Sequence, residues 1–140
     1  MSLTLEYSLE AAVTPAFAWE YRTNVANWHD PPAEFALNGP FREGAVGTTH
    51  IPGQPPMHWQ ITRVRAGESF MTTMELDRAT LSFEWTFEPL PPERTKITQR
   101  IVLSGDNFKA YAAQVEAGFG PNLAGGMRKI VAGMERQSRA

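Results

Sequence analysis

The chain alternates between apolar and polar residues over long stretches, and this period of two predicts β-strands. Within residues 79–88, Leu81, Phe83, Trp85 and Phe87 lie on one face, and the positions between them are polar. Strands with one covered and one wet face are typical of antiparallel sheets. Short turns separate the later strands, so a meander of hairpins is expected. Seven segments are interpreted as strands: residues 3–9, 35–37, 45–51, 57–65, 69–77, 79–88 and 94–104.

Two short helices are expected after the first strand. Thr14 and Pro15 have the residue types of an N-cap followed by a proline at the first helical position, and they open a helix that runs through Tyr21. A second short helix or turn covers residues 24–28 and ends before the prolines at 31–32.

A long C-terminal helix is predicted over residues 107–137, with turn and cap residues supplied by 104–107. Two apolar stripes run along it, rotated from one another by roughly 80° on a straight helix. Pro121 lies between the stripes and predicts a kink or local unwinding that lets both face the same sheet. The first stripe is Phe108, Tyr111, Ala112, Val115 and Phe119, and the second is Leu123, Met127, Ile130 and Met134.

The composition of the chain sets the expected number of domains and excludes several kinds of site and partner. A chain of 140 residues with 42% hydrophobic residues is expected to form one domain, residues 1–140, with its own core. The absence of Cys excludes disulfides, thiolate zinc sites and a Cys nucleophile. A net charge of -2 argues against a nucleic-acid partner. No stretch has the roughly 18 apolar residues of a membrane span, and no signal-peptide pattern is present, so no integral membrane association and a cytoplasmic location are expected.

The charge is distributed unevenly along the chain. Residues 1–93 carry a formal charge of -7, and residues 94–140 carry +5. The solvated faces of the last strand and last helix account for this asymmetry, and a docking face for an anionic partner is the alternative.

The order of elements resembles the START-like superfamily, which includes polyketide cyclase/dehydrase-like proteins and plant pollen allergens. The resemblance implies an α+β helix-grip fold: a curved antiparallel sheet of about six or seven strands around a long kinked C-terminal helix, with two short helices after the first strand. It also implies an apolar cavity between sheet and helix, where members commonly bind small molecules. No catalytic residue set is shared across the superfamily. The resemblance rests on LTLEYSLEAAVTPAFAWEYRTNVANWHD, FREGAVGTTHIPGQPPMHWQITRVRAGESF and LSFEWTFEPLPPERTKITQRIVLSG.

The covered face is rich in large apolar side chains, which are typical of ligand pockets but can equally fill a closed core. Gln99 is a buried amide in this pattern, so it must bind a ligand oxygen or a protein neighbour, and Thr72 raises the same question. If Gln99 anchors a ligand, Gln99→Leu weakens ligand affinity and leaves the fold intact. The predicted lining is Trp59, Thr72, Met74, Phe83, Trp85, Gln99, Ile101, Tyr111, Val115, Phe119 and Met127.

Catalytic candidates are few. His29 and Asp30 form an adjacent pair near the expected cavity rim, although a surface loop is the favoured interpretation. The three histidines, at 29, 50 and 58, are scattered, so no metal site and no cofactor are expected. Glu84, Glu88, Arg63 and Arg100 fall on the wet face and are interpreted as solvated charges.

Three functions remain open at this point. The first is a binding or carrier protein for an apolar, aromatic or lipid-like small molecule. The second is a polyketide cyclase/dehydratase-type enzyme without a metal that uses the same cavity, and the third is a protein-interaction module like the chaperone activators of the superfamily. A monomer and a homodimer are both compatible with the sequence.

Overall fold

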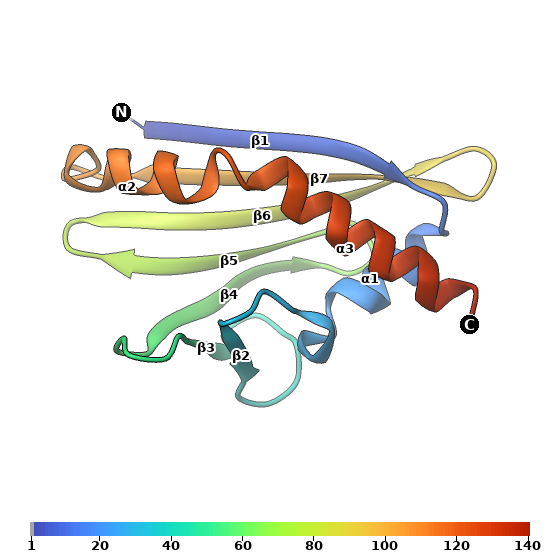
Figure 1. The fold of residues 1–140 in the computed structure, drawn as a ribbon, viewed down its shortest axis with the longest axis horizontal. Coiled ribbons are helices and arrows are strands. Elements are labelled where there is room, and N and C mark those ends of the chain that lie inside the picture. Colours follow the sequence, from blue (N-terminus) through green and yellow to red (C-terminus); the bar gives the residue numbers. More distant parts are fainter. Residues whose placement is uncertain (1) are drawn as a thin grey trace.

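The computed structural model describes residues 2–140 and contains a seven-stranded antiparallel sheet packed against helices (Figure 1). The helix-grip architecture predicted from the sequence is confirmed. The strands are β1 (Ser2–Ala11), β2 (Glu34–Leu37), β3 (Val46–His50), β4 (Met57–Arg65), β5 (Ser69–Leu76), β6 (Ala79–Leu90) and β7 (Arg94–Ser104). The helices are α1 (Pro15–Arg22), the single 3₁₀ turn η1 (Val25–Asn27), α2 (Lys109–Phe119) and α3 (Leu123–Ser138).

The sheet order is β1-β7-β6-β5-β4-β3-β2. Strands β2 to β7 therefore form the expected meander, and the first strand lies beside the last. The β1–β7 register runs from Ser2 opposite Ser104 to Ala11 opposite Thr95. This pairing leaves β1 and β2 as the two edge strands.

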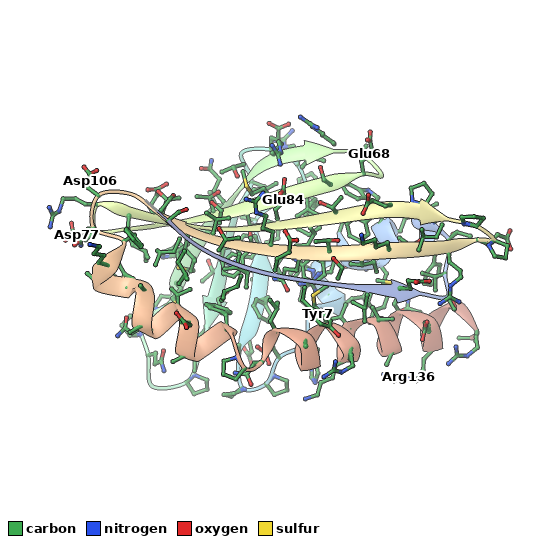
Figure 2. All side chains as sticks on the ribbon, turned by 90° about the horizontal axis from the view of Figure 1, so that it is seen from above. Tyr7, Glu68, Asp77, Glu84, Asp106 and Arg136 are labelled. Atoms are coloured by element: carbon green, nitrogen blue, oxygen red, sulfur yellow. The ribbon has the colours of Figure 1, made fainter. Side chains whose placement is uncertain are left out.

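One face of the sheet carries the core. Helices α2 and α3 run along this face and pack mainly on β1 and β7, with Glu84 on the opposite side (Figure 2). Two apolar clusters result. One surrounds Phe70, Trp85 and Met127 beneath α1 and α3, and the other surrounds Leu81, Ile101 and Val115 beneath α2.

The C-terminal helix is interrupted between Phe119 and Leu123, where Pro121 predicted a kink or local unwinding. Gly120 and Asn122 keep right-handed helical dihedral angles, so the interruption is a local break in the hydrogen-bond ladder. The predicted cap is wrong in one respect. Helix α2 begins without a side-chain cap, because the Asn107 amide instead donates to the Asp77 carbonyl in the β5–β6 turn, at 3.0 Å.

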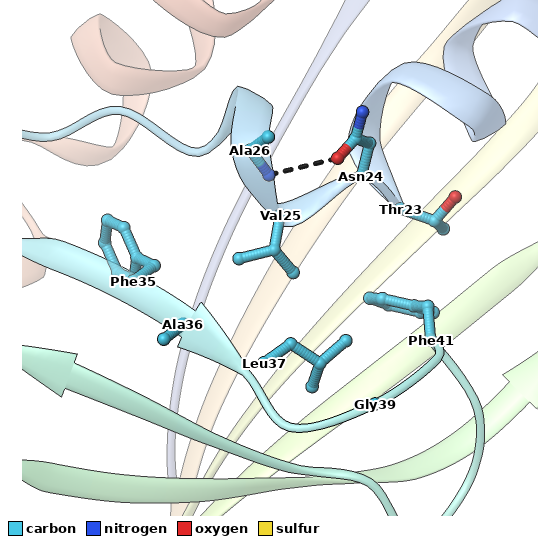
Figure 3. Close-up of a pocket in the computed structure, with 9 residues that line it drawn as sticks. All are labelled: Thr23, Asn24, Val25, Ala26, Phe35, Ala36, Leu37, Gly39 and Phe41. Atoms are coloured by element: carbon cyan, nitrogen blue, oxygen red, sulfur yellow. Dashed lines mark hydrogen bonds between the residues drawn. The ribbon is translucent and has the colours of Figure 1, made fainter.

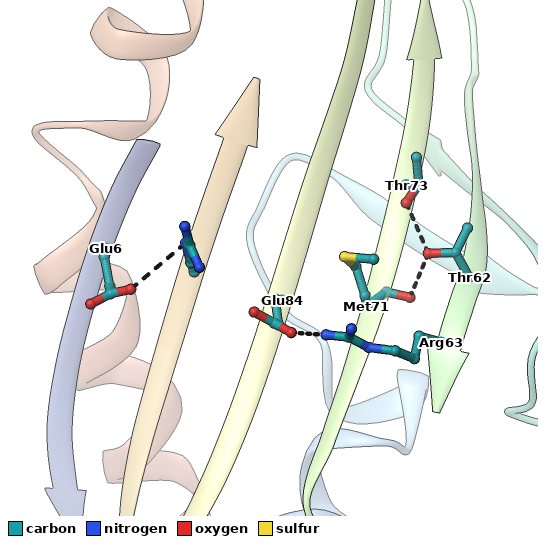
Figure 4. A network of polar contacts seen from close by, with 7 residues as sticks. Glu6, Thr62, Arg63, Met71, Thr73 and Glu84 are labelled. Atoms are coloured by element: carbon teal, nitrogen blue, oxygen red, sulfur yellow. Dashed lines mark hydrogen bonds and ion pairs between the residues drawn. The ribbon is translucent and has the colours of Figure 1, made fainter. Parts of the chain in front are cut away.

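The outer face of the sheet carries the charged residues, as the alternation predicted (Figure 4). Arg63 pairs with Glu84 across β4 and β6, and Arg100 lies 3.9 Å from Glu6. Glu88 is exposed. In residues 2–140, no helix is both long and apolar enough to cross a membrane.

Candidate functional site

The C-terminal end of α1 is tied to the turn that follows it. The Thr14 hydroxyl caps the start of the helix by accepting from the Phe17 N–H, at 3.2 Å. At the other end, three side chains donate to carbonyl groups in the last turn of the helix. The bonds are Thr23 Oγ1 to Trp19 O at 2.7 Å, Asn27 Nδ2 to Tyr21 O at 2.9 Å and Trp28 Nε1 to Arg22 O at 2.7 Å. These bonds orient Arg22 and Trp28 relative to each other.

Arg22 and three tryptophans form a cluster on the inner face, called the Arg22 cluster below. The guanidinium carbon of Arg22 lies 4.1 Å from the ring centroid of Trp85 and 4.7 Å from that of Trp28. Trp28 stacks on Trp59 with ring centroids 5.3 Å apart. Both distances from Arg22 are within the range of cation–π attraction.

Trp59 is held from two sides. Its Nε1 donates to Thr49 Oγ1 at 3.0 Å. Its ring lies so close to Gly47 in β3 that a Cβ there would lie 2.2 Å from the indole. The missing side chain at position 47 is therefore what gives the indole its place in the cluster.

No carboxylate of residues 2–140 lies within ion-pair distance of the Arg22 guanidinium. Its Nε is sealed from solvent and has no hydrogen-bond partner. Burial lowers the pKa of Arg22 to about 9, with a smaller opposing effect from Tyr21. The guanidinium therefore still carries its charge at neutral pH, although its surroundings are aromatic.

A groove of about 500 Å³ lies next to this cluster, between η1 and the β2–β3 region. Figure 3 shows Val25, Leu37 and Phe41 converging on it. Its aromatic walls contact the cluster's neighbours: Phe35 packs edge-on to Trp28 at 5.7 Å, and Phe41 packs edge-on to Phe70 at 5.0 Å. The full lining is Thr23, Asn24, Val25, Ala26, Phe35, Ala36, Leu37, Gly39 and Phe41.

The residues predicted to line a cavity fall into separate groups, and none of them lines this groove. Trp85 and Met127 belong to the core beneath α1 and α3, and Trp59 stacks on Trp28. Thr72 is buried. Gln99 is only half-buried, and its amide is not among the groups that are sealed from solvent and lack a hydrogen-bond partner. The remaining six pack together beneath α2: Met74, Phe83, Ile101, Tyr111, Val115 and Phe119. Their role in ligand binding stays a prediction.

The weak catalytic candidates are exposed. His29 and Asp30 both lie at the surface in the turn after η1, where Asp30 pairs with Ala33. His50 and His58 are also exposed. Within the described part of the chain, no three His, Asp or Glu side chains are grouped as a metal site would require.

Sequence reasoning missed Arg22 and Trp28. The available signal was a basic residue, Arg22, at the end of a short segment that carries aromatic residues at 17, 19 and 21. A charge on that apolar stripe is unusual, because charged residues are rarely buried without a partner.

Comparison with known families gives one match. Residues 2–136 match the model described as polyketide cyclase/dehydrase and lipid transport. A comparison with curated proteins finds no match.

Solved structures of the same fold are similar over nearly the whole chain. The Zhui aromatase/cyclase from Streptomyces sp. R1128 is 18% identical, with a TM-score of 0.76 over 100% of this chain and 98% of that one. A norcoclaurine synthase point mutant from Thalictrum flavum is 12% identical, with a TM-score of 0.73 over 100% and 98% of the two chains. Ara h 8.0201 is 13% identical, with a TM-score of 0.69 over 98% and 99%. At these identities the similarity is one of fold.

Proposed function

The chain belongs to the polyketide cyclase/dehydrase and lipid transport family, and from this we propose that it binds a small aromatic molecule beside the Arg22 cluster. The observation that carries the proposal is the concentration of aromatic rings around an accessible groove. Trp28 and Phe70 each contact one wall of the groove and also belong to the inner-face packing. Concave sites lined mainly by apolar and aromatic groups are the usual binding sites for small molecules.

The size of the groove supports a ligand of two or three fused rings. A volume of about 500 Å³ lies within the range of small-molecule sites, roughly 300–1,000 Å³. The groove is open on one side, so a ligand can enter without a large rearrangement of the sheet.

An enzyme of the polyketide cyclase/dehydratase type is the second candidate, favoured by the family match. General acid–base chemistry needs a titratable group within hydrogen-bond reach of the substrate. The described lining of the groove has no Asp, Glu or His, and the His29–Asp30 pair is exposed in a neighbouring turn. We therefore rank binding ahead of catalysis.

Titration with N-phenyl-1-naphthylamine, a neutral probe whose fluorescence rises in apolar surroundings, tests the proposal. Saturable binding at a stoichiometry of one is the expected result. Quenching of tryptophan emission should accompany it, because Trp28 packs on Phe35 in the groove wall and Trp59 stacks on Trp28. An unsaturable or absent signal would remove the binding function. Gln99→Leu tests the wider predicted lining: unchanged probe affinity would exclude Gln99 from the site.

A further inference from the structure

The positive charge of Arg22 has no ion-pair partner among the described residues, and side-chain packing alone does not account for it. Two sealed side-chain atoms in residues 2–140 lack a hydrogen-bond partner, and they are the Nε atoms of Arg22 and Arg63. Arg63 is nevertheless paired, through its Nη2, with Glu84 on the outer face. Arg22 has no such partner among the described residues, so its charge is the one that its surroundings do not balance.

The geometry leaves one part of the guanidinium available. The guanidinium carbon lies over the rings of Trp28 and Trp85, and Nε is sealed from solvent. The two terminal nitrogens of Arg22 are not sealed from solvent in this way, and the residue as a whole is half-buried. These nitrogens are the pair that binds a carboxylate in a bidentate manner.

The helix that carries Arg22 does not use the charge. The C-terminal dipole of α1 favours a cation at this end. However, the Thr23, Asn27 and Trp28 side chains already satisfy the carbonyls of Trp19, Tyr21 and Arg22. The guanidinium lies instead over the ring of Trp85, which belongs to β6.

Arg22 lies beside the groove: the next residue, Thr23, lines it, and Trp28, which contacts the guanidinium, packs on Phe35 in its wall. We propose that Arg22 binds the carboxylate of a planar aromatic acid whose rings lie in this groove. This narrows the ligand class of the proposed function and rests on it. The planar guanidinium matches a carboxylate, and the indoles and phenyl rings match an aromatic body. A charged residue held without a protein partner against aromatic rings is expected where a ligand completes the site.

The test compares two ligands of nearly equal shape, 2-naphthoate and 2-naphthamide, by isothermal titration calorimetry at pH 7. The naphthoate is expected to bind at least about tenfold more tightly, because a charge-assisted hydrogen bond replaces a neutral one. This comparison uses the unmodified chain, so it does not depend on whether a variant folds.

Two variants then locate the preference. Arg22→Met is expected to reduce the ratio of the two affinities to within about twofold. Arg100→Met removes the same charge from the outer face, where the Arg100 side chain is 51% exposed, and is expected to keep the ratio. Circular dichroism spectra of both variants check that they are folded.

The outcomes separate this inference from the proposed function. Equal affinities for the two ligands, or a preference that persists in Arg22→Met, would overturn the role of Arg22. Binding of N-phenyl-1-naphthylamine without binding of either naphthalene derivative would also overturn it and leave the proposed function standing. Failure of the neutral probe as well would overturn both.

Discussion

Replacing Arg22 by methionine is expected to stabilise the ligand-free protein slightly. Methionine keeps an unbranched apolar stem against Trp28 and Trp85 and removes the guanidinium. The substitution therefore removes both an unfavourable burial of charge and two favourable contacts with indole rings. The sign of the net effect depends on which contribution is larger.

Burial lowers the pKa of Arg22 well below its ordinary value, to about 9 in the folded chain. At about 1.36 kcal/mol per pKa unit, this depression corresponds to about 5 kcal/mol of destabilisation at neutral pH. Each desolvated cation–π contact contributes about 2 kcal/mol in the opposite direction, or about 4 kcal/mol for the two. The Arg22→Met variant is therefore expected to be about 1 kcal/mol more stable, which raises Tm by about 3 °C in a chain of this size.

Urea unfolding at pH 7, followed by circular dichroism, measures this difference. Arg100→Met is the matched control and is expected to change stability by less than about 1 kcal/mol, because the ion pair with Glu6 is at the surface. A loss of more than about 2 kcal/mol in Arg22→Met would refute the reasoning. It would mean that the guanidinium stabilises the folded chain and serves its structure.

Three further predictions concern the same region and its supports. Gly47→Ala places a methyl group against the Trp59 ring, so a loss of about 1–3 kcal/mol and an altered near-ultraviolet circular dichroism spectrum are expected, and unchanged values would contradict the packing. In α3, Gly126→Ala meets open space and is expected to gain about 1 kcal/mol, whereas Gly133→Ala would lie 2.7 Å from the Tyr21 hydroxyl and is expected to show no gain; equal gains would contradict this contact. Above pH 9, the folded chain releases the Arg22 proton before the unfolded chain does, so the free energy of unfolding of the wild type should rise relative to that of Arg22→Met. A difference between the two free energies that stays constant with pH in urea titrations would contradict the low pKa. Over the same range, calorimetry should show weaker naphthoate binding.

The long strands were predictable because one face of each is largely covered by the helices or the core, whereas the other faces solvent. In β6, Leu81, Trp85 and Phe87 are buried, and the alternation in the sequence reports this directly. The Thr14 cap and the interruption at Pro121 were predictable for local reasons, since cap and proline effects act within one helical turn. Asn107 was assigned wrongly because its partner, the Asp77 carbonyl, belongs to a distant turn.

The Arg22 cluster could not be predicted in the same way. Its members come from α1, the turn after η1, β4 and β6. No short segment of the sequence therefore contains more than two of the four residues. The groove depends in addition on β2, a strand of four residues whose pattern is too short to determine its neighbours. Positions of this kind follow from the register of the whole sheet.

The pairing of β1 with β7 has a consequence for synthesis of the chain. Strand β1 leaves the ribosome well before its partner, and it can pair only after residues 94–104 have emerged. The hairpins from β2 to β7 can assemble one after another, but β1 must wait, and contacts between distant segments slow folding. A chain stopped before β7 would leave an unpaired, half-apolar strand exposed. The N-terminal segment is therefore where we expect a nascent chain of this protein to depend most on protection from aggregation.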